Sequence, residues 1–137
     1  LCYPYVVTHL MTKYFIPNID ARKSLADKLN LRYQDNMQDW EYEVADMNRL
    51  ADFENQYLLS DTNDKERESL MEIMLDSLND SLELNDLKIF NDFAPRIIKY
   101  LKENNQIHEG TINYWTECDF LISNKIIPTM KNENRNN

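Results

Sequence analysis

Apolar residues recur at intervals of three and four along much of the chain, which is the spacing of one face of an α-helix. The clearest stretch covers residues 65–82. Its apolar positions are Leu70, Met71, Met74, Leu75, Leu78 and Leu82. Acidic residues recur every four positions along the other side, at Asp64, Glu68, Glu72, Asp76 and Asp80. We predict an amphipathic helix whose acidic row winds slowly around it, because steps of four residues overshoot a full turn by about 40°.

The same spacing predicts five further helices, over residues 4–15, 21–31, 40–58, 85–104 and 106–121. Asp20 is placed to cap the helix over 21–31. Pro95 falls inside the helix over 85–104, where an interior proline costs about 3 kcal/mol. We therefore expect a kink there, or a new helix capped by Asp92. In a helix interior, Gly110 would lower the stability of the helix by about 1 kcal/mol relative to alanine. The alternative is that the last helix starts after Gly110.

The composition favours helices over sheets. The chain of 137 residues contains one glycine and no Asn-Gly or Asp-Gly pair of the kind that signals a β-hairpin. Its length is typical of one domain, and 42% hydrophobic residues are enough for a core. We predict an all-α fold, a compact bundle of five to seven helices with a single helical domain over residues 1–130. Residues 131–137 contain no apolar side chain, and we expect them to form a disordered C-terminal tail.

The net charge of −9 is concentrated in the middle of the chain. Residues 35–92 contain seventeen acidic and four basic residues, whereas the segments before and after them carry net charges of +3 and +1. Such a field repels nucleic acid and anionic membrane surfaces, and it attracts basic proteins and accelerates their encounter. A merely solvated acidic surface would have the same composition, and this interpretation stays open.

The sequence contains no pattern for a metal or a cofactor. The two histidines, His9 and His108, and the two cysteines, Cys2 and Cys118, lack the spacing of a zinc site. The single glycine excludes glycine-rich phosphate-binding loops. We expect both cysteines to be reduced, which favours a cytoplasmic protein, and no run of 18 apolar residues predicts a membrane-spanning helix. We therefore expect no cofactor, no metal and no membrane contact.

No arrangement of residues indicates a catalytic site. Cys118 and His108 could pair as nucleophile and base, but no sequence signature links them. The chain has 24 acidic residues, so two carboxylates can lie close together by chance. Such a pair is therefore not a specific sign of acid–base catalysis. The basic residues of segment 22–32, which are Arg22, Lys23, Lys28 and Arg32, could contact phosphate, although the net charge opposes this. We expect a protein that is not an enzyme and does not bind nucleic acid directly.

Carboxylates of the middle segment are the candidate partner-binding residues. They are Asp39, Glu41, Glu43, Asp46, Asp64, Glu68, Glu72, Asp76 and Asp80. Trp40 and Trp115 could also anchor an interface, because tryptophan is enriched in binding hot spots. Each of the two lies on an apolar helix face, so packing in the core is the favoured interpretation.

Three stretches combine acidic residues with aromatic or apolar ones, namely WEYEVAD at 40–46, KERESLMEIMLDSLND at 65–80 and YWTECD at 114–119, and the apolar stretch IPTM follows at 127–130. In style and layout they resemble the small acidic immunity proteins of bacterial polymorphic-toxin systems, including contact-dependent growth inhibition. The resemblance implies a cytoplasmic inhibitor that binds a basic toxin domain, such as a nuclease. It further implies a 1:1 heterodimer in which acidic helix surfaces occlude the active site of the toxin.

Two other classes of function remain open at this stage. The first is a helical adaptor or regulatory protein-interaction module without a toxin partner, which an exposed apolar groove or a stable homodimer would favour. The second is an enzyme whose site is assembled from scattered acidic residues. A deep polar pocket with several carboxylates, or a bound metal, would favour the enzyme. The basic helix over residues 21–31 could also be the functional face.

Overall fold

The structure is a computed structural model of the chain, and it describes residues 13–126 and residue 128. Within that part the regular secondary structure is entirely helical. The elements are α1 (Ile19–Leu29), α2 (Trp40–Glu43), the 3₁₀ helix η1 (Met47–Arg49), α3 (Leu50–Leu58), α4 (Asp64–Glu83), α5 (Leu87–Glu103) and α6 (Glu109–Glu117). The predicted all-α bundle is confirmed.

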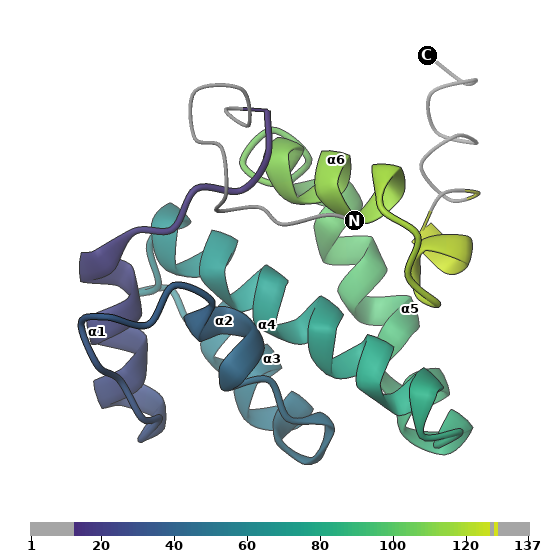
Figure 1. Ribbon diagram of the computed structural model, residues 1–137, viewed down its shortest axis with the longest axis horizontal. Helices are drawn as coiled ribbons and strands as arrows, with labels where there is room; N and C mark the ends of the chain where they lie inside the picture. Colours follow the sequence, from purple (N-terminus) through teal and green to yellow (C-terminus); the bar gives the residue numbers. More distant parts are fainter. Residues whose placement is uncertain (1–12, 127, 129–137) are drawn as a thin grey trace.

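α4 is the central helix, and the other elements surround it (Figure 1). α1, α2, η1, α3, α5 and α6 all contact α4, and twelve of its twenty residues are buried. The apolar stripe predicted for this helix does face the core. The acidic row, however, faces solvent only in part: Asp64 is exposed, whereas Glu72 is buried because neighbouring helices pack over that part of α4.

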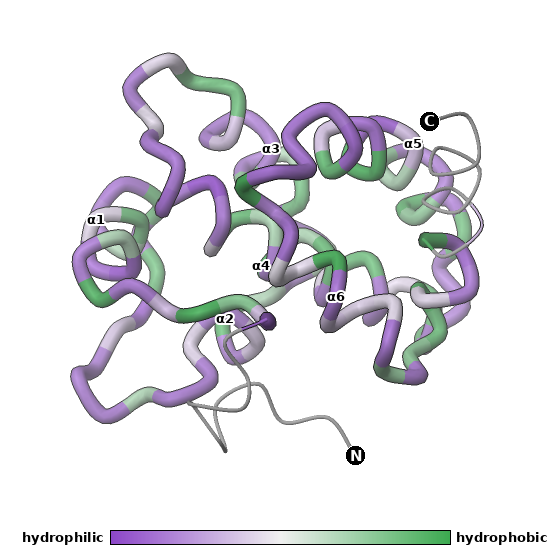
Figure 2. The backbone as a smooth tube through the Cα atoms, turned by 90° about the horizontal axis from the view of Figure 1, so that it is seen from above, coloured by the Kyte–Doolittle hydropathy of each residue, from purple (hydrophilic) through white to green (hydrophobic). Residues whose placement is uncertain are grey.

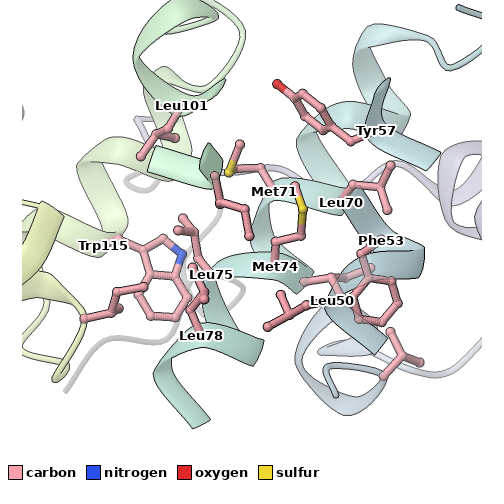
Figure 3. Close-up of a cluster of buried hydrophobic side chains, with 14 of the residues drawn as sticks. Leu50, Phe53, Tyr57, Leu70, Met71, Met74, Leu75, Leu78, Leu101 and Trp115 are labelled. Carbon is pink, nitrogen blue, oxygen red and sulfur yellow. The ribbon is translucent and has the colours of Figure 1, made fainter. Parts of the chain in front are cut away.

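The hydrophobic core lies along α4, between it and α3, α5 and α6 (Figure 3). The labelled core side chains are Leu50, Phe53, Tyr57, Leu70, Met71, Met74, Leu75, Leu78, Leu101 and Trp115. Trp40 and Trp115 are 0% and 1% exposed, which confirms that both pack in the core. Burying one large apolar side chain contributes about 1.5–3 kcal/mol, so this cluster holds α4 firmly at the centre. In Figure 2 the loops at the edge of the molecule are mostly hydrophilic.

The predicted helix over residues 40–58 is interrupted. α2 ends at Glu43, and helical structure resumes at Met47 after an extended residue, Asp46. The Asp46 carboxylate accepts a 2.9 Å hydrogen bond from the N–H of Asn48, and its own N–H donates a 2.9 Å bond to Oγ of Ser77 on α4. A side chain that caps the next turn competes with helical hydrogen bonds, and here the contact with α4 holds the break in place.

α5 continues through Pro95, so the predicted restart at Asp92 is wrong. The helix is capped by Asp86, whose carboxylate accepts a 3.2 Å hydrogen bond from a first-turn N–H. Proline removes one N–H from the helical pattern. The carbonyl without its usual donor is that of Asn91, four residues before the proline. The guanidinium of Arg96 donates a 2.6 Å hydrogen bond to the next carbonyl, that of Asp92.

The predicted helix over residues 4–15 falls almost wholly outside the described residues, and its described end, 13–15, is not helical. The cap of α1 is Asn18 and not the expected Asp20. The Asn18 side chain accepts a 2.8 Å hydrogen bond from the N–H of Ala21. The predicted tail over 131–137 also lies outside the described residues.

Gly110, the single glycine, lies in the first turn of α6, where the backbone of residues 13–15 contacts this helix. A Cβ atom at this position would lie 2.6 Å from the carbonyl carbon of Tyr14 and 2.7 Å from the backbone nitrogen of Phe15. Any side chain would push the two backbones apart, so the close approach requires glycine. α6 accordingly begins at Glu109, before the glycine and not after it.

Cys118 follows α6, is 3% exposed and forms a disulfide bond. The expectation of two reduced cysteines is therefore wrong for Cys118. Among the helices of residues 13–126, none has the length and apolar character that crossing a membrane requires.

Candidate acidic binding site

The nine predicted partner-binding carboxylates differ in burial. Two of them, Glu41 and Glu72, are 0% exposed. Three are exposed, namely Asp39, Glu43 and Asp64, and four are partly buried, namely Asp46, Glu68, Asp76 and Asp80. The surroundings of each carboxylate therefore decide what it can contact.

Glu41 holds α2 against α1 and is already engaged within the protein. The guanidinium of Arg22 donates to both carboxylate oxygens, from Nε at 2.9 Å and from Nη2 at 2.5 Å, and Oγ of Ser69 donates at 3.0 Å. The same guanidinium donates 2.9 Å hydrogen bonds to the carbonyls of Met37 and Gln38. A buried ion pair is tolerated when hydrogen bonds satisfy both groups in this way. Glu41 is thus a structural residue.

The basic residues of segment 22–32 are also engaged within the protein. Arg22 is 4% exposed, and the ammonium groups of Lys23 and Lys28 lie 3.7 Å and 3.0 Å from carboxylates. Arg32 donates a 2.7 Å hydrogen bond to a backbone carbonyl at the end of α2. Phosphate binding by this segment would have to compete with all of these contacts.

Asp64 and Glu68 lie at the first turns of α4 and pair with bases on the same helix. Asp64 lies 4.0 Å from Arg67, and Glu68 lies 3.3 Å from Lys65. Exposed pairs of this kind contribute little to stability, typically about 0–1 kcal/mol. These two carboxylates are accessible, and each already has a positive neighbour.

Asp39 and Glu43 border a surface hollow of about 860 Å³ beside α2. The residues that line it are Arg32, Tyr33, Gln34, Asn36, Met37, Gln38, Asp39 and Glu43. The lining combines one guanidinium with two carboxylates, so its charge selects neither a cation nor an anion strongly. This hollow therefore does not by itself indicate a ligand.

The second half of α4 has a different character, because the charged groups of the described residues that shift the pKa values of Asp76 and Asp80 are all carboxylates. Asp76 and Asp80 lie one turn apart, near Glu83 and near Asp46 of the α2–η1 junction. No ion pair joins any of these four to a lysine or arginine within the described residues. Burial raises the pKa of Asp76 to about 7, and the charges of neighbouring carboxylates, Asp80 first, add to the rise. Burial also raises the pKa of Asp80.

Glu72 lies one turn before Asp76 and is the most buried carboxylate of the row. The Tyr42 hydroxyl donates a 2.6 Å hydrogen bond to Oε1 of Glu72, and Nε1 of Trp115 donates to the same oxygen at 3.3 Å. The Thr111 side chain of α6 also acts on this carboxylate through a hydrogen bond that lowers its pKa, while Oε2 has no close hydrogen-bond partner among the described residues. Burial raises the pKa of Glu72 to about 7, although the Tyr42 hydrogen bond opposes the rise.

Aromatic rings from α2 and α6 surround these carboxylates. The rings of Tyr42 and Tyr114 stack with their centroids 6.3 Å apart, and Trp115 stands edge-on to both, at 6.5 Å and 5.5 Å. Burial raises the pKa of the Tyr114 phenol, and the nearby charges of Glu72 and Asp76 raise it further. The rings and the carboxylates therefore lie close together. The helices that carry the rings, α2 and α6, lie on the same side of α4 (Figure 2).

We define the α4 carboxylate site as Asp46, Glu72, Asp76, Asp80 and Glu83, and the aromatic cluster as Tyr42, Tyr114 and Trp115. Four of the five carboxylates were predicted from the sequence. Glu83 was missed, although it follows Asp80 by three residues and so continues the same helical face. Trp115 was named as a possible interface anchor, but its contact with Tyr42 and Tyr114 was missed, because no spacing relates residues that lie about 70 positions apart in the chain.

A second buried polar group lies on the opposite end of α6. His108 is 0% exposed, and its Nε2 lies 2.8 Å from the Tyr57 hydroxyl, while its Nδ1 has no partner within residues 13–126. Burial lowers the pKa of His108 to about 4, so the ring is neutral near pH 7. Because Cys118 is disulfide-bonded, it offers no thiol as a nucleophile for this histidine.

Within the part of the chain that the structure describes, no group of three or more histidine, cysteine or acidic side chains is arranged to hold a metal ion. Comparison with known proteins found no matching protein-family model, no matching curated protein and no matching solved structure.

Proposed function

We propose that this protein binds a basic protein through the α4 carboxylate site and the exposed carboxylates beside it, Asp39 and Glu43. The observation that carries the proposal is the absence of any neutralising cation around Asp46, Asp76, Asp80 and Glu83 in the described structure. Burial and like charges raise the pKa values of Asp76 and Asp80, and such perturbed values are typical of functional sites.

The energetics favour a cationic partner. Partly buried carboxylates have lost part of their hydration, and their like-charged neighbours repel them. Lysine or arginine side chains of a partner would supply the missing opposite charge in a site where water is partly excluded, and charge pairs are stronger there than at an open surface. The net charge of −9 would also accelerate the encounter with a basic protein.

Together with the family resemblance, this supports an immunity protein that neutralises a toxin domain, with a nuclease as the expected toxin. A nuclease binds phosphates in a basic cleft. Carboxylates on a rigid helix can occupy the positions of those phosphates and occlude the active site, in a 1:1 heterodimer. The protein would not itself be an enzyme or require a cofactor.

The proposal places the protein in the cytoplasm, where the nucleic acid targets of such toxins lie. Disulfide bonds are rare in that compartment, whereas Cys118 is disulfide-bonded in the structure. Alkylation of thiols in freshly lysed cells, followed by mass spectrometry, tests this part of the proposal. Because Cys118 is only 3% exposed, the alkylation is carried out in denaturant. A cytoplasmic protein should then show Cys118 alkylated, and an oxidised Cys118 in cells would contradict the location.

The proposal as a whole is tested by coexpression with host proteins and capture of the tagged chain at low and high salt. We expect one basic partner near 1:1, toxic when expressed alone. The variant Asp76→Asn/Asp80→Asn should lose much of this capture. Asp92→Asn/Glu103→Asn changes the charge equally at exposed positions of α5 and should retain it. Equal capture by both variants would contradict the proposed surface.

A helical adaptor is the second candidate, and exposed leucines favour it. Leu84 and Leu87, on either side of the turn between α4 and α5, are 67% and 55% exposed. Exposed apolar side chains near one another are a common feature of protein contacts. Sedimentation velocity of the isolated protein separates the two candidates: a stable self-association that Leu84→Ser/Leu87→Ser abolishes would favour the adaptor.

A further inference from the structure

We propose that the disulfide bond of Cys118 is a redox-dependent latch, formed with Cys2, that holds residues 13–15 against α6 and releases them when it is reduced. Cys118 is disulfide-bonded, and Cys2 is the one other cysteine of the sequence. Within a single chain the sequence therefore leaves Cys2 as the partner, although Cys2 itself lies outside the described residues. The inference concerns a chemical change of this chain and does not rest on the proposed function.

The contacts of residues 13–15 define how they lie along α6. The first turn of α6 meets their backbone at Gly110. One turn further on, the Asn113 side chain donates a 2.8 Å hydrogen bond to the carbonyl of Lys13. In the last turn, Glu117 accepts a 2.6 Å hydrogen bond from the ammonium group of Lys13. Lys13 therefore lies at the C-terminal end of α6, directly before the cysteine that forms the disulfide bond.

The non-covalent contacts at this end of the segment are weak. The ion pair between Lys13 and Glu117 is open to water, with side chains that are 54% and 43% exposed, and such pairs contribute little to stability. Phe15, at the other end of the segment, is buried. A covalent link from the preceding residues to Cys118 raises the effective concentration of the segment at α6, so it can hold contacts that are weak by themselves.

The segment covers part of the surface of α6. The ring of Tyr14 stands edge-on to the ring of Tyr114, with the two centroids 5.8 Å apart. Tyr114 is buried and belongs to the aromatic cluster. Release of residues 13–15 would therefore expose aromatic side chains, and exposed apolar surface is a common site of protein contacts. The oxidation state of Cys118 would thus control access to this surface of α6.

The latch opens by thiol–disulfide exchange with a dithiol, such as a small dithiol protein or dithiothreitol. Cys118 is 3% exposed, so we expect the first thiolate of the reductant to attack the sulfur of Cys2. The bond between the two cysteines breaks, and Cys118 leaves as a thiolate that takes up a proton. The second thiol of the reductant then closes a disulfide bond within the reductant and releases Cys2 as a thiol. Two electrons pass to the protein, and the reductant is oxidised.

Such a latch agrees with the compartment that the proposed function requires. Disulfide bonds of cytoplasmic proteins are usually transient, and they are typically catalytic or redox-sensing. We expect Cys118 to be reduced in unstressed cells and to form the bond when the thiol pool becomes oxidised.

The proposal is tested by limited trypsin digestion of the folded protein, both oxidised and reduced with dithiothreitol. Trypsin cleaves after Lys13 only when the ammonium group leaves Glu117 and the carbonyl leaves Asn113. We expect this cleavage to be about tenfold faster in the reduced protein, because local opening becomes more frequent. Cleavage after Lys23, whose side chain is 55% exposed on α1, should not change, and reoxidation should restore the slow cleavage after Lys13.

Two variants and a peptide map make the result specific. Cys118→Ser cannot form the bond, so it should be cleaved after Lys13 as fast as the reduced protein, with or without dithiothreitol. Glu117→Gln keeps the disulfide bond and weakens only the ion pair, so its cleavage should remain sensitive to reduction. A tryptic map prepared without reduction should show peptide 1–13 joined to peptide 103–125.

Equal cleavage after Lys13 in the oxidised and reduced protein would overturn the proposal, as would a map in which Cys118 is free or joined to a second chain. Circular dichroism follows the helix content during reduction. If reduction abolishes the helices, the bond is a structural cross-link of the whole fold and the latch is wrong. None of these readouts involves a partner, so the proposed function is decided separately, by partner capture.

Discussion

The hydroxyl of Tyr42 donates a 2.6 Å hydrogen bond to Oε1 of Glu72, which joins α2 to the interior of the central helix. Glu72 is 0% exposed, and burial raises its pKa to about 7. The carboxyl group therefore exchanges its proton near physiological pH inside the protein. This relationship determines how stability and binding should respond to pH and to substitution.

Replacement of Glu72 by glutamine should stabilise the protein at pH 8. The pKa of Glu72 is about 7 in the folded protein and near 4.5 in the unfolded chain. Between these values the folded protein retains a proton that the unfolded chain has released, so stability falls as the pH rises. The full difference amounts to roughly 3 kcal/mol. Urea unfolding at pH 4 and pH 8 should show a gain for Glu72→Gln at pH 8 and almost none at pH 4; an equal gain at both would contradict the raised pKa.

Asp76→Asn should also stabilise the protein, more at pH 8 than at pH 4, because its pKa is raised from 3.8 to about 7. Neighbouring negative charges cause part of this rise in the pKa of Asp76, and Asp80 contributes the most among them. Salt screens such repulsion, so added sodium chloride should raise the urea midpoint of the unaltered protein more than that of Asp76→Asn. Asp92→Asn, at an exposed position, should leave the salt response unchanged.

Glu41→Gln should destabilise the protein by about 3–5 kcal/mol, because it leaves the Arg22 guanidinium buried without its counterion. Removal of both groups together, as in Arg22→Met/Glu41→Leu, should cost much less than the sum of the single changes. A double-mutant cycle from urea unfolding measures this coupling. Additive losses would show that the two residues act independently.

Gly110→Ala should destabilise the protein, although glycine to alanine in an exposed helix normally stabilises it by about 1 kcal/mol. The added Cβ would lie 2.6 Å from the backbone of Tyr14. Residues 13–15 should therefore be displaced from α6, and limited proteolysis should cut them faster. Asn113→Ala removes only the 2.8 Å hydrogen bond from this side chain to the carbonyl of Lys13 and should have a smaller effect. A more stable Gly110→Ala variant would contradict the close contact.

His108 should remain neutral down to about pH 5 in the folded protein, because burial lowers its pKa to about 4. In the unfolded chain its pKa is near 6.5. Between these values the unfolded chain binds the extra proton, so this residue removes stability as the pH falls. A titration of the histidine ring signals by NMR, folded and in urea, measures both values. Protonation of folded His108 near pH 6.5 would contradict its burial.

Local features of the sequence determined which segments are helical. The interval of three and four between apolar residues predicted the central part of α4 and the position of α5, because each pattern depends only on the geometry of a single helix. The preference of asparagine for helix starts agrees with Asn63, whose side chain accepts from the N–H of Glu66 at 2.8 Å at the start of α4. The scarcity of glycine pointed correctly to a fold without strands in its described part.

Only the tertiary structure decided which carboxylates of the acidic row of α4 are buried and which are exposed. Every member recurs at the same interval, yet Asp64 is exposed and Glu72 is in the interior, because α2 and α6 pack over one part of the helix and not over the other. Tyr42 and Trp115 donate hydrogen bonds to Glu72, and they lie 30 and 43 residues away from it in the sequence. The break at Asp46 and the need for glycine at Gly110 arise in the same way, from contacts with Ser77 and with the backbone of Tyr14. Helix formation is a local property of the chain, whereas burial and pairing depend on which distant segments pack together.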